Sequence, residues 1–223
     1  MVLKCYGTLG SMAEIKKVIK LVKKEVQKYE NPVVAEIGNK SPFHVLISCI
    51  LSLRTRDETT ARVSSELFKK ANTPNEILHM KRNLEKTIHS VNYYKTKAKR
   101  IREICKILAK RNNKVPETMD DLLELPGVGR KTANIVLVYG FGKEGMPVDT
   151  HVHRIPNRLG WVNTKKPEQT EDALRKIIPK KYWKDFNDIF VTFGQNVCKP
   201  VSPKCEKCPV TIHCDYYKNK GYS

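Results

Sequence analysis

The sequence predicts an all-α fold, and three observations support that prediction. Apolar residues recur at helical spacing in several long stretches, and no stretch shows the period-two alternation of a half-buried strand. Helix-opening signals recur along the chain, with Ser or Thr placed before Pro or before an acidic turn. The sequence contains no internal repeat, and its 223 residues suffice for one large domain or two smaller lobes.

The first expected helix covers residues 12–29 and should end before Pro32. Its apolar stripe consists of Ile15, Val18, Ile19, Val22 and Val26, opposite a lysine-rich face. Residues 1–11 show no helical periodicity. We interpret them as a disordered N-terminus or the remnant of an expression tag, and we exclude them from the fold.

Later helices are marked by capping residues and by proline. Ser41 and Pro42 open a buried helix over residues 43–53, another begins at Asp57 and runs towards residue 70, and Thr73 caps the next. Residues 81–114 are strongly basic, with Tyr93 and Tyr94 on a short loop. The clearest C-terminal helix covers residues 182–195. Its apolar stripe consists of Trp183, Phe186, Phe190 and Phe193.

The charge of the chain indicates a polyanionic partner. Lys and Arg number 42 against 23 Asp and Glu, and the resulting formal charge of +19 is far more than solubility requires. No segment has the length of apolar residues that spans a bilayer, and no signal peptide is visible. We therefore expect the partner to be DNA and not a membrane, and an intracellular location in the cytoplasm or nucleoid.

Residues 125–134 predict a turn between two helices that could bind a phosphate. Thr118 should cap the first helix, Pro126 should end it, and Gly127 and Gly129 should supply backbone conformations that other residues avoid. Free backbone N–H groups at the start of the second helix form an anion site. An ordinary αα-hairpin is the alternative. Arg130 and Lys131 argue against it, because each opposes the helix dipole at a cost of about 0.3–1 kcal/mol.

Four of the seven cysteines lie close together near the C-terminus, as Cys198-x6-Cys205-x2-Cys208-x5-Cys214. Disulfides are not expected in a basic protein without a signal peptide. A four-thiolate zinc site remains an alternative, but such sites usually pair two short Cys-x2-Cys elements. One short pair with two wider arms favours an iron–sulfur cluster. Cys49 and Cys105 lie in apolar helical segments, where a cysteine is usually just a small buried side chain.

Three motifs together resemble the endonuclease III family of helix–hairpin–helix DNA base-excision glycosylases: the 125–134 hairpin, Val148-Asp149-Thr150-His151, and the cysteine spacing. The resemblance implies a 4Fe–4S cluster on Cys198, Cys205, Cys208 and Cys214. It also implies a monomer with a six-helix barrel over residues 36–143, containing the helix–hairpin–helix motif at 119–139. Residues 12–35 and 144–223 would form a discontinuous cluster lobe, and DNA would bind in a cleft between the two lobes.

The resemblance also assigns the chemistry. Lys131 falls on the position of the family's catalytic lysine, which attacks C1′, forms a Schiff base and permits β-elimination. Phosphate binding is the alternative role for this lysine. Asp149 follows eighteen positions later and would transfer a proton or stabilise positive charge on the sugar, although a helix N-cap is its alternative role.

The remaining candidates are DNA contacts. Gly127, Gly129 and Arg130 would meet phosphate at the hairpin, and Lys199, Lys204 and Lys207 would do so beside the cysteines. Arg54 stands where the family usually has glutamine in a loop that enters the duplex, and Tyr93 falls on a second such position. Phosphate pairing and a half-buried surface aromatic are their respective alternatives. His151 would line the base pocket or be a polar helix residue.

The function implied is a bifunctional DNA glycosylase and abasic-site lyase, which removes oxidised or ring-saturated pyrimidines in base excision repair. Its partner would be double-stranded DNA carrying a damaged base or an abasic site. A mismatch or other-base glycosylase of the same superfamily is one alternative. A non-catalytic cluster protein that binds DNA structure is another, but it would not need the pairing of Lys131 with Asp149.

Overall fold

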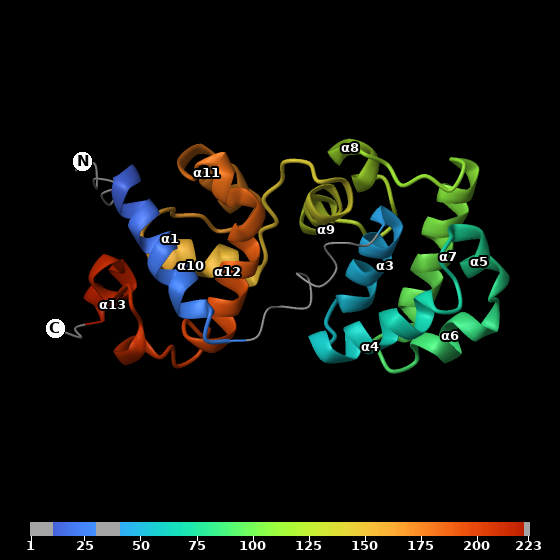
Figure 1. Cartoon of the computed structure of the whole chain (residues 1–223), viewed down its shortest axis with the longest axis horizontal. Coiled ribbons are helices and arrows are strands. Elements are labelled where there is room, and N and C mark those ends of the chain that lie inside the picture. The colour runs from blue at the N-terminus through green and yellow to red at the C-terminus, as the bar shows by residue number, and fades with distance from the viewer. Residues whose placement is uncertain (1–10, 30–40, 221–223) are drawn as a thin grey trace. The chain divides into compact units, whose positions relative to one another are not determined.

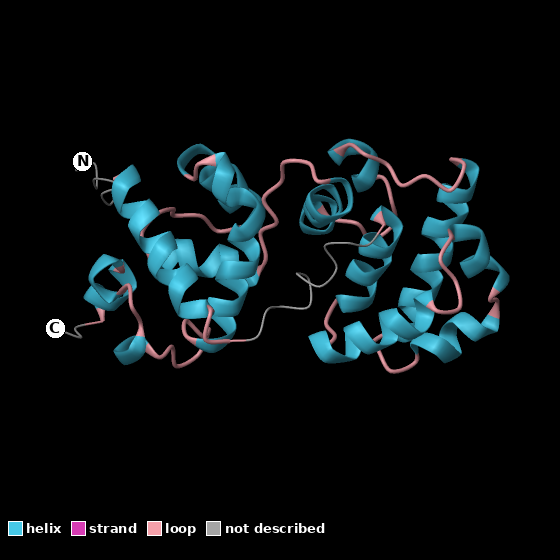
Figure 2. Ribbon diagram, viewed as in Figure 1, coloured by secondary structure: helices cyan, strands magenta, loops and turns pink. Residues whose placement is uncertain are grey.

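The computed structural model describes residues 11–29 and 41–220, and every regular element in those ranges is helical, as the sequence predicts (Figures 1 and 2). The chain divides into two compact units, Val33–Gly145 and Met1–Pro32 with Met146–Ser223. The expected boundaries were 36 and 143, and Glu36 and Pro32 lie outside the described residues. Among the described helices, none is both long and apolar enough to cross a bilayer.

The unit Val33–Gly145 is assembled around α3 (Pro42–Ser52), which is buried along almost its whole length. This helix packs against α4 (Asp57–Phe68), α7 (Tyr94–Lys110) and α9 (Arg130–Ile135). The short helices α5 (Pro74–His79), α6 (Arg82–Ile88) and α8 (Met119–Leu123) complete the unit. Cys49 and Cys105 are buried in its core, as expected.

Helix α9 does not continue as a regular α-helix through residues 136–140. The apolar run from Val136 to Gly140 forms a π turn, η1, which packs against α3. A Cβ at Gly140 would lie 2.9 Å from the Cα of Pro42, so the absence of a side chain permits this close approach. Such turns are rare and frequently lie at functional sites.

The other unit combines an N-terminal helix with the C-terminal part of the chain. Its elements are α1 (Met12–Val26), α10 (Thr150–Arg158), α11 (Pro167–Ile177), η2 (Lys180–Tyr182), α12 (Trp183–Asn196), η3 (Cys205–Lys207), η4 (Thr211–His213) and α13 (Asp215–Asn219). The predicted stripe of α12 is buried, and Phe186 and Phe190 stack with centroids 4.3 Å apart. The stripe of α1 packs into the same core.

Side-chain caps fix the starts of several helices. Ser41, Thr73 and Thr118 each accept a hydrogen bond from the backbone N–H three residues later, at 3.2–3.3 Å, as predicted. Ser11 does the same for α1 at 3.2 Å, so the exclusion of residues 1–11 from the fold was wrong at Ser11. The spacing of apolar residues gave no sign of this cap, because a cap lies outside the helix that it opens.

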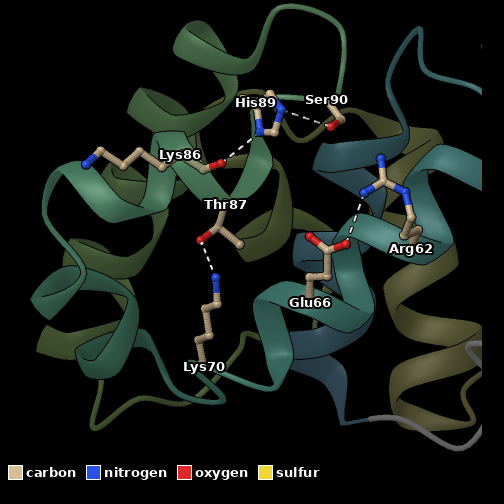
Figure 3. Close-up of polar contacts among 7 residues, drawn as sticks. All are labelled: Arg62, Glu66, Lys70, Lys86, Thr87, His89 and Ser90. Atoms are coloured by element: carbon tan, nitrogen blue, oxygen red, sulfur yellow. Dashed lines mark hydrogen bonds and ion pairs between the residues drawn. The ribbon is translucent and has the colours of Figure 1, made fainter.

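Short polar contacts also tie neighbouring helices together at the surface. The ammonium group of Lys70, just after α4, donates to the hydroxyl of Thr87 in α6 at 3.3 Å (Figure 3). In the same region Arg62 and Glu66 form an ion pair along α4 at 3.0 Å. Both members of that pair are largely exposed, so it adds little to stability.

Candidate active site

The predicted hairpin joins α8 to α9, with Leu125 and Val128 buried beneath it as anchors. Val128 N–H donates to the carbonyl of Leu125 at 3.0 Å, which closes the turn. Gly127 and Gly129 are both exposed at its surface. The turn therefore presents backbone to solvent at the N-terminal end of α9, as an anion site requires.

The two glycines have different roles. Gly127 has φ +77°, and a Cβ there would lie 2.2 Å from the side chain of Arg100. Gly129 has φ −103° with nothing within 4 Å of a Cβ, so the expectation that both need unusual backbone conformations is wrong for Gly129. Its missing side chain leaves the backbone of the anion site open.

Lys131 is the second residue of α9, and its side chain is exposed. The next residues, Thr132 to Ile135, are buried and hold the start of the helix against the core. Burial raises the pKa of the Cys49 thiol in α3 to about 12, and the charge of Lys131 opposes that rise. The Lys131 ammonium therefore lies within electrostatic reach of α3.

Asp149 belongs to the other unit, where it is the N-cap of α10. One carboxylate oxygen accepts hydrogen bonds from the backbone N–H groups of His151 and Val152, both at 2.9 Å. The interpretation of Asp149 as a helix cap is thus confirmed. Two backbone N–H groups and the nearby guanidinium of Arg154 place positive charge around this carboxylate.

His151 is half-buried and faces its own unit. A Cβ on Gly194 in α12 would lie 2.2 Å from Nδ1 of His151, so the imidazole packs directly on that glycine. Arg154 Nη2 lies 3.1 Å from the same nitrogen and donates to the carbonyl of Cys198 at 2.7 Å. Arg154 thereby connects the start of α10 with the first of the four C-terminal cysteines.

Arg54 and Tyr93 lie on two loops of the unit Val33–Gly145. Hydrogen bonds join these two loops to each other. Both residues are exposed and left-handed, with φ +54° and +58°. Such a conformation costs a non-glycine residue about 1–3 kcal/mol and persists only where its surroundings impose it. Asn92 Nδ2 donates to the carbonyl of Arg54, and Asn92 N–H donates to Thr55 Oγ1 at 3.2 Å.

The four C-terminal cysteines line one pocket, together with Arg158 and Tyr216. Over the described ranges 11–29 and 41–220, no three Cys, His, Asp or Glu side chains are grouped to hold a metal ion. Four thiols lining one pocket are the donor set that a 4Fe–4S cluster uses, with one thiolate for each iron corner.

The chemistry of the pocket also fits a cationic metal group. Burial raises the pKa of Cys208 to about 12 and also raises the pKa values of Cys205 and Cys214, so thiolates there require a positive partner. Arg158 Nη1 donates to the sulfur of Cys198 at 3.3 Å, and the guanidinium stacks on Tyr216. Arg158 was not identified from the sequence. Its position on the helix opened by Asp149 was the available signal.

The three candidate lysines beside the cysteines differ in their exposure to solvent. Lys207 is exposed, whereas Lys199 is half-buried and its carbonyl accepts a hydrogen bond from Arg158 at 2.7 Å. Lys204 is exposed as well.

The sequence analysis also did not identify Lys97. It lies on the apolar stripe of α7 formed with Ile101, Ile104 and Leu108, and a lysine at such a position is itself a signal.

Comparison with known proteins defines the class. Residues 47–180 match the family described as HhH-GPD superfamily base excision DNA repair protein. Endonuclease III of Thermotoga maritima is 50% identical over 182 residues, covering 81% of this chain and 85% of that protein. Endonuclease III of Rickettsia conorii is 39% identical over 186 residues, covering 82% and 89%.

Solved structures give the same result. A trapped covalent endonuclease III–DNA intermediate matches with a TM-score of 0.83 at 34% identity, covering 94% of this chain and 98% of that one. A thermostable thymine-DNA glycosylase matches with a TM-score of 0.81 at 25% identity, covering 93% and 98%. The fold is therefore that of a helix–hairpin–helix base excision repair protein. Within that class the chain belongs to the endonuclease III family, and it is a DNA glycosylase and abasic-site lyase.

The hairpin geometry predicts unequal effects of two matched substitutions. Gly127→Ala should lower the free energy of unfolding by about 1–2 kcal/mol more than Gly129→Ala, because only Gly127 is left-handed. Urea unfolding of the two single variants measures the difference. Gly129→Ala is the control for adding a methyl group to the same turn. Equal losses would contradict the assignment of the strained position to Gly127.

Proposed function

We propose that the chain excises oxidised or ring-saturated pyrimidines from double-stranded DNA, with Lys131 as nucleophile and Asp149 as electrostatic stabiliser. The observation that carries the proposal is the exposed amine of Lys131 at the N-terminal end of α9, beside a turn of accessible backbone. The neighbour described as a trapped covalent intermediate supports a covalent mechanism. Membership of the endonuclease III family supports the choice of the pyrimidine class.

The reaction follows from an amine held at the damaged nucleotide. The neutral Lys131 Nζ attacks C1′, the N-glycosidic bond breaks, and its electron pair leaves with the base, which takes up a proton. Opening of the sugar ring gives an iminium ion between Nζ and C1′. The iminium acidifies the C2′ proton, and loss of that proton expels the 3′ phosphate by β-elimination. Hydrolysis of the remaining imine then frees Lys131.

Asp149 is better suited to stabilising charge than to acting as a strong base. Its carboxylate accepts two backbone hydrogen bonds, which fix its position at the start of α10. A fixed negative charge stabilises the positive charge that develops on the sugar as the base leaves. The capping role and the catalytic role are therefore compatible in one carboxylate.

DNA is held through phosphate and through the loops that open the duplex. The backbone around Gly127 and Gly129, with Arg130, forms the phosphate site of the hairpin. Arg54 and Tyr93 project from their loops to fill the space left by a flipped nucleotide, which costs a few kcal/mol to create. The exposed side chains of Lys204 and Lys207, with Lys199, contribute positive charge beside the cysteine pocket.

Cys198, Cys205, Cys208 and Cys214 hold a 4Fe–4S cluster in this proposal. The shared pocket and the raised pKa values of three of these thiols support it, because buried thiolates need a cationic group. These four cysteines, as cluster ligands, would tie together the chain from residue 198 to residue 214 and so order it. Arg158, which donates to the sulfur of Cys198, orients the first ligand.

A second candidate is removal of mismatched thymine, favoured by the 25% identity to a thermostable thymine-DNA glycosylase. The 50% identity to an endonuclease III favours damaged pyrimidines instead. Both activities begin with base flipping, and they differ in the base that is released. A comparison of the lesions on which the protein acts therefore distinguishes these two activities.

Lys131→Gln should abolish borohydride trapping on a panel of duplexes that each carry one lesion, because an amide cannot form the iminium ion. Asp149→Asn should slow base excision by a factor on the order of 10²–10³ but slow cleavage of a pre-formed abasic site less. The wild type should trap on oxidised pyrimidines and not on a thymine–guanine mismatch. Trapping by Lys131→Gln would show that another amine is the nucleophile.

The purified protein should be brown and contain iron and inorganic sulfide in equal amounts. Cys205→Ser should lose iron and destabilise mainly the unit that contains α12, because the core of Val33–Gly145 is separate. Metal analysis and hydrogen exchange measure these effects. A colourless protein with stoichiometric zinc would contradict the cluster.

Binding to undamaged duplex should weaken log-linearly with salt concentration, because counterions are released as the protein binds. Neutralising Lys199, Lys204 and Lys207 to Gln should flatten the slope by about one unit for each phosphate that the variant no longer binds. Fluorescence anisotropy over a range of salt concentrations measures the slope. An unchanged slope in the triple variant would exclude these lysines from the DNA interface.

A further inference from the structure

Lys97 is a buried cation whose surroundings contain no compensating carboxylate. It lies in α7 and is 3% exposed. No ion pair between residues of the described ranges 11–29 and 41–220 includes it. Burial lowers the pKa of Lys97 to about 8, yet the amine is still mostly protonated at neutral pH. A charge kept in such a place must be stabilised by neutral acceptors.

Those acceptors lie where α3 ends and the Arg54 loop begins. The Lys97 ammonium donates to the carbonyl of Leu51 at 2.6 Å and to Thr55 Oγ1 at 2.8 Å. The last turn of α3 contains no basic residue of its own. Carbonyls at a helix C-terminus carry partial negative charge and are stabilised by a nearby cation. Lys97 supplies that cation from α7.

The hydroxyl of Thr55 links the two loops that carry the proposed DNA-inserting side chains. It accepts from Lys97 and from the backbone N–H of Asn92, and it donates to the carbonyl of Leu53 at 3.4 Å. One donor and two acceptors are all that a hydroxyl offers, so this group is fully used. The side chain of Asn92 donates to the carbonyl of Arg54 and completes the junction.

We propose that Lys97 is a positioning residue for DNA opening, which locks the Arg54 loop to the Tyr93 loop so that both side chains enter the duplex as one preassembled unit. The proposal rests on the proposed roles of Arg54 and Tyr93. Both backbones are left-handed, and the bonds from Lys97, Thr55 and Asn92 are what impose that geometry. A preassembled pair does not have to be ordered when it meets DNA.

Two substrates separate positioning from simple structural support. In duplex DNA the two loops must separate the abasic site from its partner strand. The same strand alone has no partner strand to displace, so its cleavage does not need the loops. Lys97→Met keeps an unbranched side chain that is one atom shorter, and it removes the charge and both hydrogen bonds. It should lower kcat/KM for cleavage of the duplex at least about tenfold, as small misplacements do, and leave cleavage of the single strand unchanged.

The controls use other lysine substitutions. Lys97→Arg retains donors for both acceptors and should recover most of the duplex activity. Lys70→Met removes a lysine from the same unit whose ammonium also bonds a neutral hydroxyl, that of Thr87 (Figure 3). Lys70 bonds to neither loop, so this variant should cleave duplex like the wild type. 2-Aminopurine placed opposite the abasic site should brighten on binding wild type but not Lys97→Met.

Equal loss on duplex and single strand would overturn the proposal, because Lys97 would then support the whole unit. No loss on either substrate would also overturn it. If Lys97→Met does not fold by circular dichroism, Asn92→Ala breaks the same junction at an exposed residue and should lose duplex activity alone. Its failure to do so would overturn the proposal. Borohydride trapping by the wild type tests the proposed function separately, since trapping does not depend on how these variants behave.

Discussion

Burial of α3 is the constraint on which the unit Val33–Gly145 depends. An 11-residue helix with eight buried residues has no solvent-facing side, so every neighbouring element must cover part of it. The helix after the hairpin, the π turn η1 and α7 all pack against it. Its C-terminal end leads directly to Arg54. The proposed phosphate-binding turn and the proposed duplex-opening loops are therefore both held by one apolar helix, to which no catalytic role is assigned.

In the unit that contains α10, polar contacts around this helix hold the candidate site residues in place. Asp149 caps the start of this helix, and Arg154 and Arg158 extend from it to the carbonyl and the sulfur of Cys198. The cysteine segment contains only short 3-10 turns and one short helix, so regular hydrogen bonding does little to fix it. Arginine side chains from a regular helix take over part of that task, and metal ligation would take over the rest.

Local patterns predicted the elements well because helices are specified locally. Ser41, Thr73 and Thr118 were identified as caps from adjacent residues, and the stripe of α12 from its spacing. Resemblance to a family supplied Lys131 and Asp149, which spacing alone would have left as a phosphate contact and a cap. Lys97 and Arg158 escaped notice because their partners lie 42–46 and 40–42 positions away in the chain. Gly129 shows the opposite error, since a glycine was assigned a backbone role that the backbone does not require.

The discontinuity of the second unit has a consequence for synthesis of the chain. The stripe of α1 packs against α12, so Val22 must wait for residues near Phe186, 164 positions later (186 − 22), to leave the ribosome. At about 5–20 residues per second that interval is about 8–33 s. Throughout it, Ile15, Val18 and Val22 have no native partner from α12, whereas Val33–Gly145 is contiguous and can fold as it emerges. Over that interval the nascent chain therefore carries a basic segment whose apolar stripe is not yet buried against α12.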